Sequence, residues 1–235
     1  MTLKHALATL VLMVNFAAPV AAGQFEDAVD AHRRGDYLTA LRLIRPLAND
    51  GDAVAQYNLG LMYTTGQGVS QDYVMAAIWF RKAAEQGYAL AQSNLGVFYR
   101  DGRGVQRDHA EAVIWFRKAA DQGDAIGQYL LGLQWAAGEG VPQQDYAEAI
   151  KWFQKAAEQG HAVAKLHLGV MYAEGRGVRQ DYVRAHMWFN LAAAQGEQKA
   201  TKLLDMAAQR MTPAQIAEAQ KLARDRRPTT QPPPR

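Results

Sequence analysis

Residues able to do covalent chemistry are scarce in this chain of 235 residues. It contains no cysteine, which excludes disulfides, thiolate metal sites and cysteine nucleophiles. Its two serines, Ser70 and Ser93, lie outside the Gly-x-Ser-x-Gly and Ser-x-x-Lys settings that activate a serine nucleophile. The sequence therefore predicts no catalytic residue, and a carboxylate pair assembled by the fold is the one catalytic arrangement that it leaves open.

The sequence also lacks the motifs that bind metals or nucleotide cofactors. Among the six histidines, His161 and His167 are six positions apart, so they occupy different faces of a helix and do not form a His-x-x-x-His metal pair. A Gly-x-Gly sequence recurs, but a nucleotide-binding fingerprint needs a preceding strand and a third glycine, and both are missing. We expect no metal and no cofactor, and we interpret Gly-x-Gly as a turn.

The elements that carry the remaining side chains repeat with a period of about 36 residues. Four tryptophans, spaced 36, 37 and 36 residues apart, mark the register: Trp79, Trp115, Trp152 and Trp188. A fixed period of this length is typical of a solenoid, in which one supersecondary unit stacks on copies of itself.

The second half of each repeat predicts an amphipathic helix, called helix B here. Ala76, Trp79, Phe80 and Ala83 recur at the spacing of one apolar helix face. An aspartate precedes each stripe and is expected to cap the helix. These aspartates are Asp72, Asp108, Asp145 and Asp181. A glycine follows each stripe and is expected to end the helix.

The first half of each repeat predicts another helix, called helix A, which makes each repeat an αα-hairpin. A glycine inside a helix costs about 1 kcal/mol relative to alanine. Four glycines nevertheless share one register in helix A: Gly60, Gly96, Gly132 and Gly169. We interpret them as places where helix B approaches closely, with one of its aromatic side chains against the glycine.

These motifs resemble the Sel1-like repeat family, a relative of the tetratricopeptide repeat. The resemblance is carried by Ala53-x-Ala55, Leu59-Gly60, Tyr63, Gly66-x-Gly68-Val69 and Trp79-Phe80, together with their copies. It implies an all-α solenoid of αα-hairpins wound into a right-handed superhelix. The third repeat departs from the pattern, and we expect a local loop change there. Its departures are Gly127, Trp135 and the insertion at Pro142.

Domain organisation follows from the repeats. Full repeats are expected over residues 51–86, 87–122, 123–159 and 160–195. Residues 23–50 resemble a degenerate first repeat, in which Asp36 caps a helix that Pro46 should kink or end. Residues 196–226 are expected to form capping helices that cover the Trp188 face. Residues 227–235, rich in proline, are expected to be disordered.

The ends of the chain suggest export. Residues 1–22 combine a short basic start, an apolar run and small residues, the pattern of a secretory signal peptide cleaved after Ala22. No later run is long and apolar enough to span a membrane. The net charge is +3, and residues 199–235 hold eight basic and three acidic residues. A basic end can contact lipid, nucleic acid or acidic glycans, but we interpret it as a solvated end and expect no nucleic-acid partner.

A binding surface is the remaining functional candidate. In tetratricopeptide-like arrays helix A lines the concave side, so the resemblance implies an apolar groove there, suited to a peptide. The groove residues would be Val54, Tyr57, Leu61, Leu90, Ser93, Val97, Ile126, Tyr129, Leu133, Val163, Leu166 and Val170. Trp135, near a loop, is either a further contact residue or a substitute for a packed tyrosine. An equally weighted alternative is that neighbouring repeats bury these side chains against one another.

The sequence thus predicts a periplasmic or secreted monomer that is not an enzyme and that binds a protein or peptide of the cell envelope through its helix-A face. The resemblance leaves open an envelope hydrolase, directed at β-lactams or cell wall. A structural spacer without partners is a third possibility. Family membership alone does not choose among them.

Overall fold

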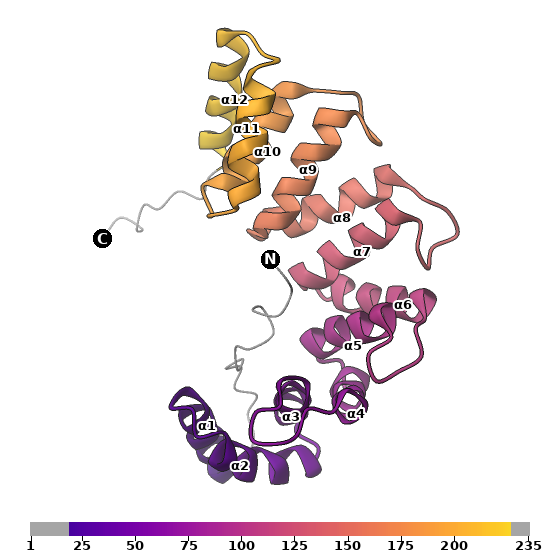
Figure 1. The fold of residues 1–235 in the computed structure, drawn as a ribbon, viewed down its shortest axis with the longest axis vertical. Coiled ribbons are helices and arrows are strands. Elements are labelled where there is room, and N and C mark those ends of the chain that lie inside the picture. Colours follow the sequence, from indigo (N-terminus) through magenta and orange to yellow (C-terminus); the bar gives the residue numbers. More distant parts are fainter. Residues whose placement is uncertain (1–18, 227–235) are drawn as a thin grey trace. The chain divides into compact units, whose positions relative to one another are not determined.

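The protein is described by a computed structural model over residues 19–226, where it consists of twelve α-helices and no strands (Figure 1). The helices are α1 (Pro19–Arg33), α2 (Tyr37–Asn49), α3 (Ala53–Thr65), α4 (Tyr73–Glu85), α5 (Ala89–Asp101), α6 (His109–Asp121), α7 (Ala125–Ala137), α8 (Tyr146–Glu158), α9 (Ala162–Glu174), α10 (Tyr182–Ala193), α11 (Gln198–Ala208) and α12 (Pro213–Asp225). The predicted all-α fold of helical hairpins is confirmed. Residues 1–18 of the expected signal peptide and the expected tail, 227–235, lie outside the described residues.

Over the described residues the chain forms two compact units, which divide after Gly127, within α7. In the first unit α1 packs on α2, α3 on α4 and α5 on α6. In the second unit α9 packs on α10, and α11 and α12 both contact α10. None of the helices in residues 19–226 combines the length and apolar character needed to cross a membrane.

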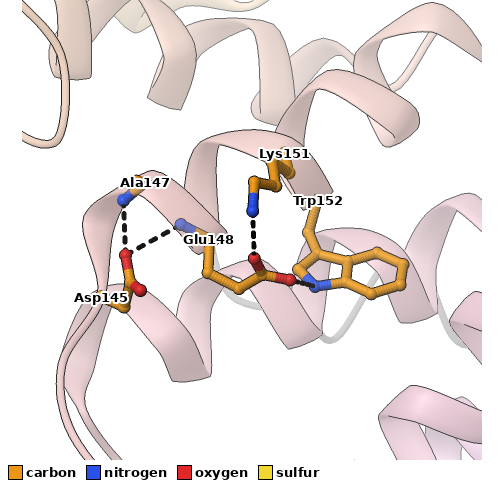
Figure 2. Close-up of polar contacts among 5 residues, drawn as sticks. All are labelled: Asp145, Ala147, Glu148, Lys151 and Trp152. Atoms are coloured by element: carbon orange, nitrogen blue, oxygen red, sulfur yellow. Dashed lines mark hydrogen bonds and ion pairs between the residues drawn. The ribbon is translucent and has the colours of Figure 1, made fainter.

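Each helix B begins at the aspartate that precedes it. The carboxylate of Asp145 accepts hydrogen bonds from the backbone N–H groups of Ala147 and Glu148, at 2.9 and 3.0 Å (Figure 2). These bonds satisfy donors in the first turn that have no partner inside the helix. Asp72 and Asp108 cap α4 and α6 with the same pair of bonds. The recurring aspartates therefore have a structural role in the repeat.

Helix A and helix B of one repeat touch at the helix-A glycine. A β-carbon on Gly60 would lie 2.7 Å from Cδ1 and Cε1 of Phe80, whose side chain is fully buried. The same relation joins Gly96 to Phe116, Gly132 to Phe153 and Gly169 to Phe189. The close approach expected from these glycines is therefore present, and the aromatic side chain is the phenylalanine.

The Gly-x-Gly loop joins one repeat to the repeat before it. Gly104 has a φ of +64°, and a β-carbon there would overlap the backbone carbonyl of Tyr73, at the start of the preceding helix B. Gly68 is held against Tyr37, and Gly177 against Tyr146, in the same way. Only glycine combines this left-handed backbone with so close a contact. The loop of each of these repeats thus covers the N-terminus of a neighbouring helix B.

The repeat tryptophans are buried, and each lies beneath a cation. The Nζ atoms of Lys82, Lys118 and Lys155 lie 4.2, 4.0 and 4.1 Å from the ring centroids of Trp79, Trp115 and Trp152. In the last repeat Leu191 replaces the lysine, and Arg226, just after α12, lies 5.0 Å from the Trp188 ring. The final tryptophan is thus also buried beneath a cation, here one from the C-terminal end of α12.

Three local features refine the expectations from the sequence. Helix α2 does not end at Pro46 but continues to Asn49. The proline lies in the last turn, where it removes only one intrahelical hydrogen bond. Helix α12 begins with a capping box between Thr212 and Gln215. The insertion at Pro142 lengthens a loop, while α7 and α8 keep thirteen residues each.

Candidate functional site

The helix-A residues proposed as a groove differ widely in exposure. In the first unit the side chains of Val54, Tyr57, Leu61, Ser93 and Val97 are buried, Leu90 is half-buried and Ile126 is 44% exposed. In the second unit Leu166 is buried, and Tyr129, Leu133, Val163 and Val170 are half-buried. Six of the twelve proposed groove residues are therefore buried, as the alternative of burial between neighbouring repeats describes.

Tyr57 shows why a helix-A side chain becomes buried. Its ring packs edge-on against Tyr88, with centroids 5.2 Å apart, and its hydroxyl accepts a hydrogen bond of 3.3 Å from the Asn94 amide. Both partners belong to the next repeat. Burial raises the pKa of Tyr57, and it raises the pKa of Tyr88 to about 12. This tyrosine pair holds two repeats together.

The position equivalent to Tyr57 in the second repeat is Ser93, which makes a polar version of the same contact. Its hydroxyl donates a 2.6 Å hydrogen bond to Asp124 Oδ2, and this carboxylate also accepts from the backbone N–H of Gly127 at 2.7 Å. The serine thus supports a helix cap. The Asp124 carboxylate is engaged by both of these contacts in capping the helix, which is a structural role.

In the second unit the equivalent position is Tyr129, which contacts two histidines. Its ring stacks on His161, with centroids 4.6 Å apart, and its hydroxyl lies 3.2 Å from Nε2 of His167. His161 caps α9 by accepting the backbone N–H of Ala164 at Nδ1, 3.1 Å away. Burial and the nearby His161 lower the pKa of His167, so its neutral form is favoured. These histidines are structural partners of Tyr129, and no metal-ligand cluster occurs within residues 19–226.

Trp135 occupies the helix-A register of a tyrosine. Its carbonyl accepts the backbone N–H of Asp145 at 3.0 Å, as the carbonyl of Tyr63 does for Asp72 at 2.9 Å. The Trp135 side chain is half-buried against the core of the second unit, and its indole nitrogen is buried. This placement matches that of a packed tyrosine.

One residue in the helix-A row, the set of positions that holds the proposed groove residues, was missed by the sequence analysis. Met206 in α11 stands 36 positions after Val170 and 73 after Leu133, which places it in the same row of the repeat. It is 53% exposed. It borders a pocket of about 210 Å³, called the Met206 pocket here. The pocket is lined by Val170, Ala173, Glu174, Tyr182, Phe189, Leu203, Met206, Ala207 and Arg210.

The Met206 pocket has the chemistry of a side-chain binding site. Val170, Leu203 and Met206 give it mainly apolar walls, and the unbranched methionine can adapt to the shape of an occupant. Its volume suits one or two aliphatic side chains. The sequence signal that would have found it is the period itself, extended past the last tryptophan into the capping helices.

Comparisons with known proteins agree with this architecture. The family model described as "Sel1 repeat" matches residues 53–88, 89–124, 125–161 and 162–197. Among solved structures, the chain is 37% identical to a protective antigen of uropathogenic Escherichia coli with an SLR fold, at a TM-score of 0.77. That match covers 87% of this chain and 46% of the antigen, so this chain spans less than half of the antigen's length.

A second structure, a Sel1 repeat protein from Oxalobacter formigenes, is 31% identical with a TM-score of 0.74, and the match covers 86% of this chain and 82% of that one. An immunity protein from Pseudomonas aeruginosa shares the fold, with 21% identity, a TM-score of 0.54 and coverage of 91% and 81%. Comparison with curated proteins finds no match. Because the family model covers more than half of the chain, this protein belongs to the Sel1 repeat family.

Proposed function

We propose that this protein is a non-catalytic interaction module of the bacterial cell envelope, which binds a protein or peptide through its helix-A surfaces. Sel1 repeat proteins are generally protein-interaction modules. The observation that carries the proposal is the Met206 pocket, where an exposed methionine borders an apolar cavity in the helix-A row. An exposed apolar side chain beside such a cavity is what a partner's side chain would cover.

The non-catalytic part of the proposal is supported by how the conspicuous polar groups are engaged. The recurring aspartates cap helices, and Ser93 binds the carboxylate of Asp124. Glu148 receives a 2.8 Å hydrogen bond from Lys151 and a 3.1 Å hydrogen bond from the indole of Trp152 (Figure 2). These contacts organise the repeat, and none of them favours the envelope hydrolase.

The envelope location is supported by the sequence of residues 1–22, which has the basic, apolar and small-residue regions of a secretory signal. In that compartment a stack of helical repeats offers a rigid surface. Because the contact residues are held by the stack, little conformational entropy is lost when a partner binds.

Photocrosslinking in living cells tests the binding surface directly. The full chain would carry a benzophenone amino acid at position 206 or, as the control, at position 78. Ile78 is 42% exposed on helix B, away from the helix-A row. We expect a specific crosslinked product from position 206 that is absent from position 78. Equal products from both positions, or none from position 206, would refute the proposed surface.

A matched pair of substitutions complements the crosslinking. Met206→Lys places a charge at the Met206 pocket and should abolish binding of the crosslinked partner. Ile78→Lys introduces the residue that the third repeat already has at that register, Lys151, and should leave binding intact. Both positions are exposed, so neither change should lower the melting temperature appreciably.

A further inference from the structure

A second pocket of the C-terminal unit lies beside the Met206 pocket and has the opposite character. It has a volume of about 580 Å³ and is called the arginine pocket here. It is lined by Tyr172, Val178, Arg179, Gln180, Asp181, Tyr182, Val183, Arg184, Arg210 and Gln215. Tyr182 and Arg210 line both pockets, so the two are adjacent.

The charged side chains of the arginine pocket are three arginines and one aspartate, a net charge of +2. Asp181 is already engaged, because it caps α10 through the backbone N–H of Arg184, at 2.9 Å, and lies 3.5 Å from the same residue's Nε. Within residues 19–226, neither Arg179 nor Arg210 forms an ion pair. Two guanidinium groups therefore face the pocket without an anion.

The polar neutral groups add donors to the pocket. The Oε1 atom of Gln215 accepts the backbone N–H of Thr212 at 2.8 Å, which leaves its amide NH₂ to donate. The hydroxyl of Tyr182 lies 3.3 Å from the donating amide of Gln180, so its proton is also available. A lining rich in donors whose one carboxylate is committed favours an occupant rich in acceptors, and paired guanidinium groups match carboxylates well.

Comparison among the repeats shows that the positive charge at the positions of Arg179 and Arg184 is specific to the last repeat. Glu111 and Glu148 stand at the register of Arg184 in the second and third repeats, and Gln106 stands at the register of Arg179 in the second. Acidic or neutral residues therefore fit this place in a repeat, and packing does not require arginine there.

The pocket is open because the array of Gly-x-Gly loops ends. In earlier repeats such a loop covers the start of the preceding helix B, as Gly177 covers Tyr146. No further Gly-x-Gly loop follows α10 in the sequence, and the turn between α11 and α12 stands beside its start instead, with Arg210 and Gln215 at the pocket. The same end of the fold thus supplies both an opening and a positive charge.

We propose that the arginine pocket recognises acidic side chains of the partner, next to an apolar side chain held in the Met206 pocket. The partner is then a segment in which aspartate or glutamate alternates with aliphatic residues. This inference rests on the proposed function and specifies its partner. The partner's carboxylates bind Arg179 and Arg210. Because Arg210 lines both pockets, it sets the spacing between these carboxylates and the partner's apolar side chain.

Binding of synthetic peptides to the full chain, measured by isothermal titration calorimetry at low salt, tests the proposal. The first probe is a capped decapeptide of alternating leucine and glutamate, and the second has glutamine in place of each glutamate. The test variant is Arg179→Gln/Arg210→Gln. The control, Arg103→Gln/Arg107→Gln, removes the same charge from the first unit and introduces residues that the first repeat has at those registers, Gln67 and Gln71.

We expect the leucine-glutamate peptide to bind the wild type and the control equally, and the test variant about tenfold more weakly or worse. Met206→Gln, which removes the apolar side chain without adding a charge, should weaken both peptides. If the test variant binds the leucine-glutamate peptide as the wild type does, the acidic partner is refuted, while a loss caused by Met206→Gln would still support the apolar surface. If inorganic polyphosphate binds more tightly than the peptide and responds to the same variant, the pocket is a phosphate site and the proposal falls.

Discussion

The ring of Phe80 fills the space that a β-carbon on Gly60 would need, 2.7 Å from its Cδ1 and Cε1 atoms. This relation between the two helices of a hairpin recurs in every full repeat. It makes the helix-A glycine a packing residue, although glycine weakens an isolated helix.

Gly60→Ala is therefore expected to destabilise the protein in spite of the better helix propensity of alanine. The gain of about 1 kcal/mol in propensity should be outweighed by overpacking against the buried ring, for a net loss of about 1 to 3 kcal/mol. Denaturant melts measure it. Adding Phe80→Leu should recover part of the loss, and a strictly additive double variant would contradict the contact.

Trp115→Ala is expected to cost about 3 to 5 kcal/mol in the free energy of unfolding, as large aromatic deletions in cores do. The side chain is only 6% exposed, with the Lys118 ammonium 4.0 Å above its ring. Lys118→Ala should cost no more than about 1 kcal/mol, because a cation over an aromatic face contributes little at an exposed position. A loss below about 1 kcal/mol for the tryptophan variant would show that its side chain is not part of the core.

Glu148→Met tests the hydrogen bond to the buried indole of Trp152 (Figure 2). Methionine is the residue of the first repeat at this register, Met75, and it leaves the indole N–H without its acceptor. We expect a loss of about 1 to 2 kcal/mol. Glu111→Met is the control, since the indole of Trp115 has no hydrogen-bond partner. Both glutamates lie in the first turn of helix B, so the loss of charge at the helix end cancels in the comparison. The ion pair with the exposed Lys151 is lost only in the Glu148 variant, and an exposed pair of this kind contributes little to the free energy of unfolding.

The sequence was sufficient for the fold because each feature of the hairpin has a local physical cause. An aspartate before a stripe caps a helix, a glycine with positive φ ends one, and a glycine within a helix needs a partner. The period then determines which unit stacks on which. The effect of Pro46 was overestimated, because the cost of a proline depends on how many residues of the helix follow it.

The binding surface was harder to predict, because the period identifies a helix face but not what the next repeat places on it. Tyr57 is covered by Tyr88 and bound by Asn94, residues that lie 31 and 37 positions further on. Met206 is the opposite case, because it is exposed but was not predicted as a contact residue. It keeps the register of Val170, but the tryptophan and glycine that mark a repeat are absent from the capping helices.

The pH dependence of stability should be set in part by two histidines of the second unit. Burial is the main cause that lowers the pKa of both His167 and His186. The positive charges of His161 and Lys199 lower the pKa of His167 further, while Glu197 opposes this shift. Asp205 opposes the shift in the pKa of His186. The unfolded chain, with an ordinary histidine pKa of 6.5, then binds more protons than the folded chain just below that pH. Stability therefore rises with pH through this window.

We accordingly expect a lower melting temperature at about pH 5.5 than at about pH 7.5, with the loss developing as the pH falls below 6.5. His167→Asn/His186→Ile should flatten this dependence. These substitutions introduce residues that other repeats have at the same registers, Asn94 and Ile150, so the hairpins should still fold. Melting curves by circular dichroism at a series of pH values measure the effect. An unchanged slope in the double variant would assign the dependence to other groups.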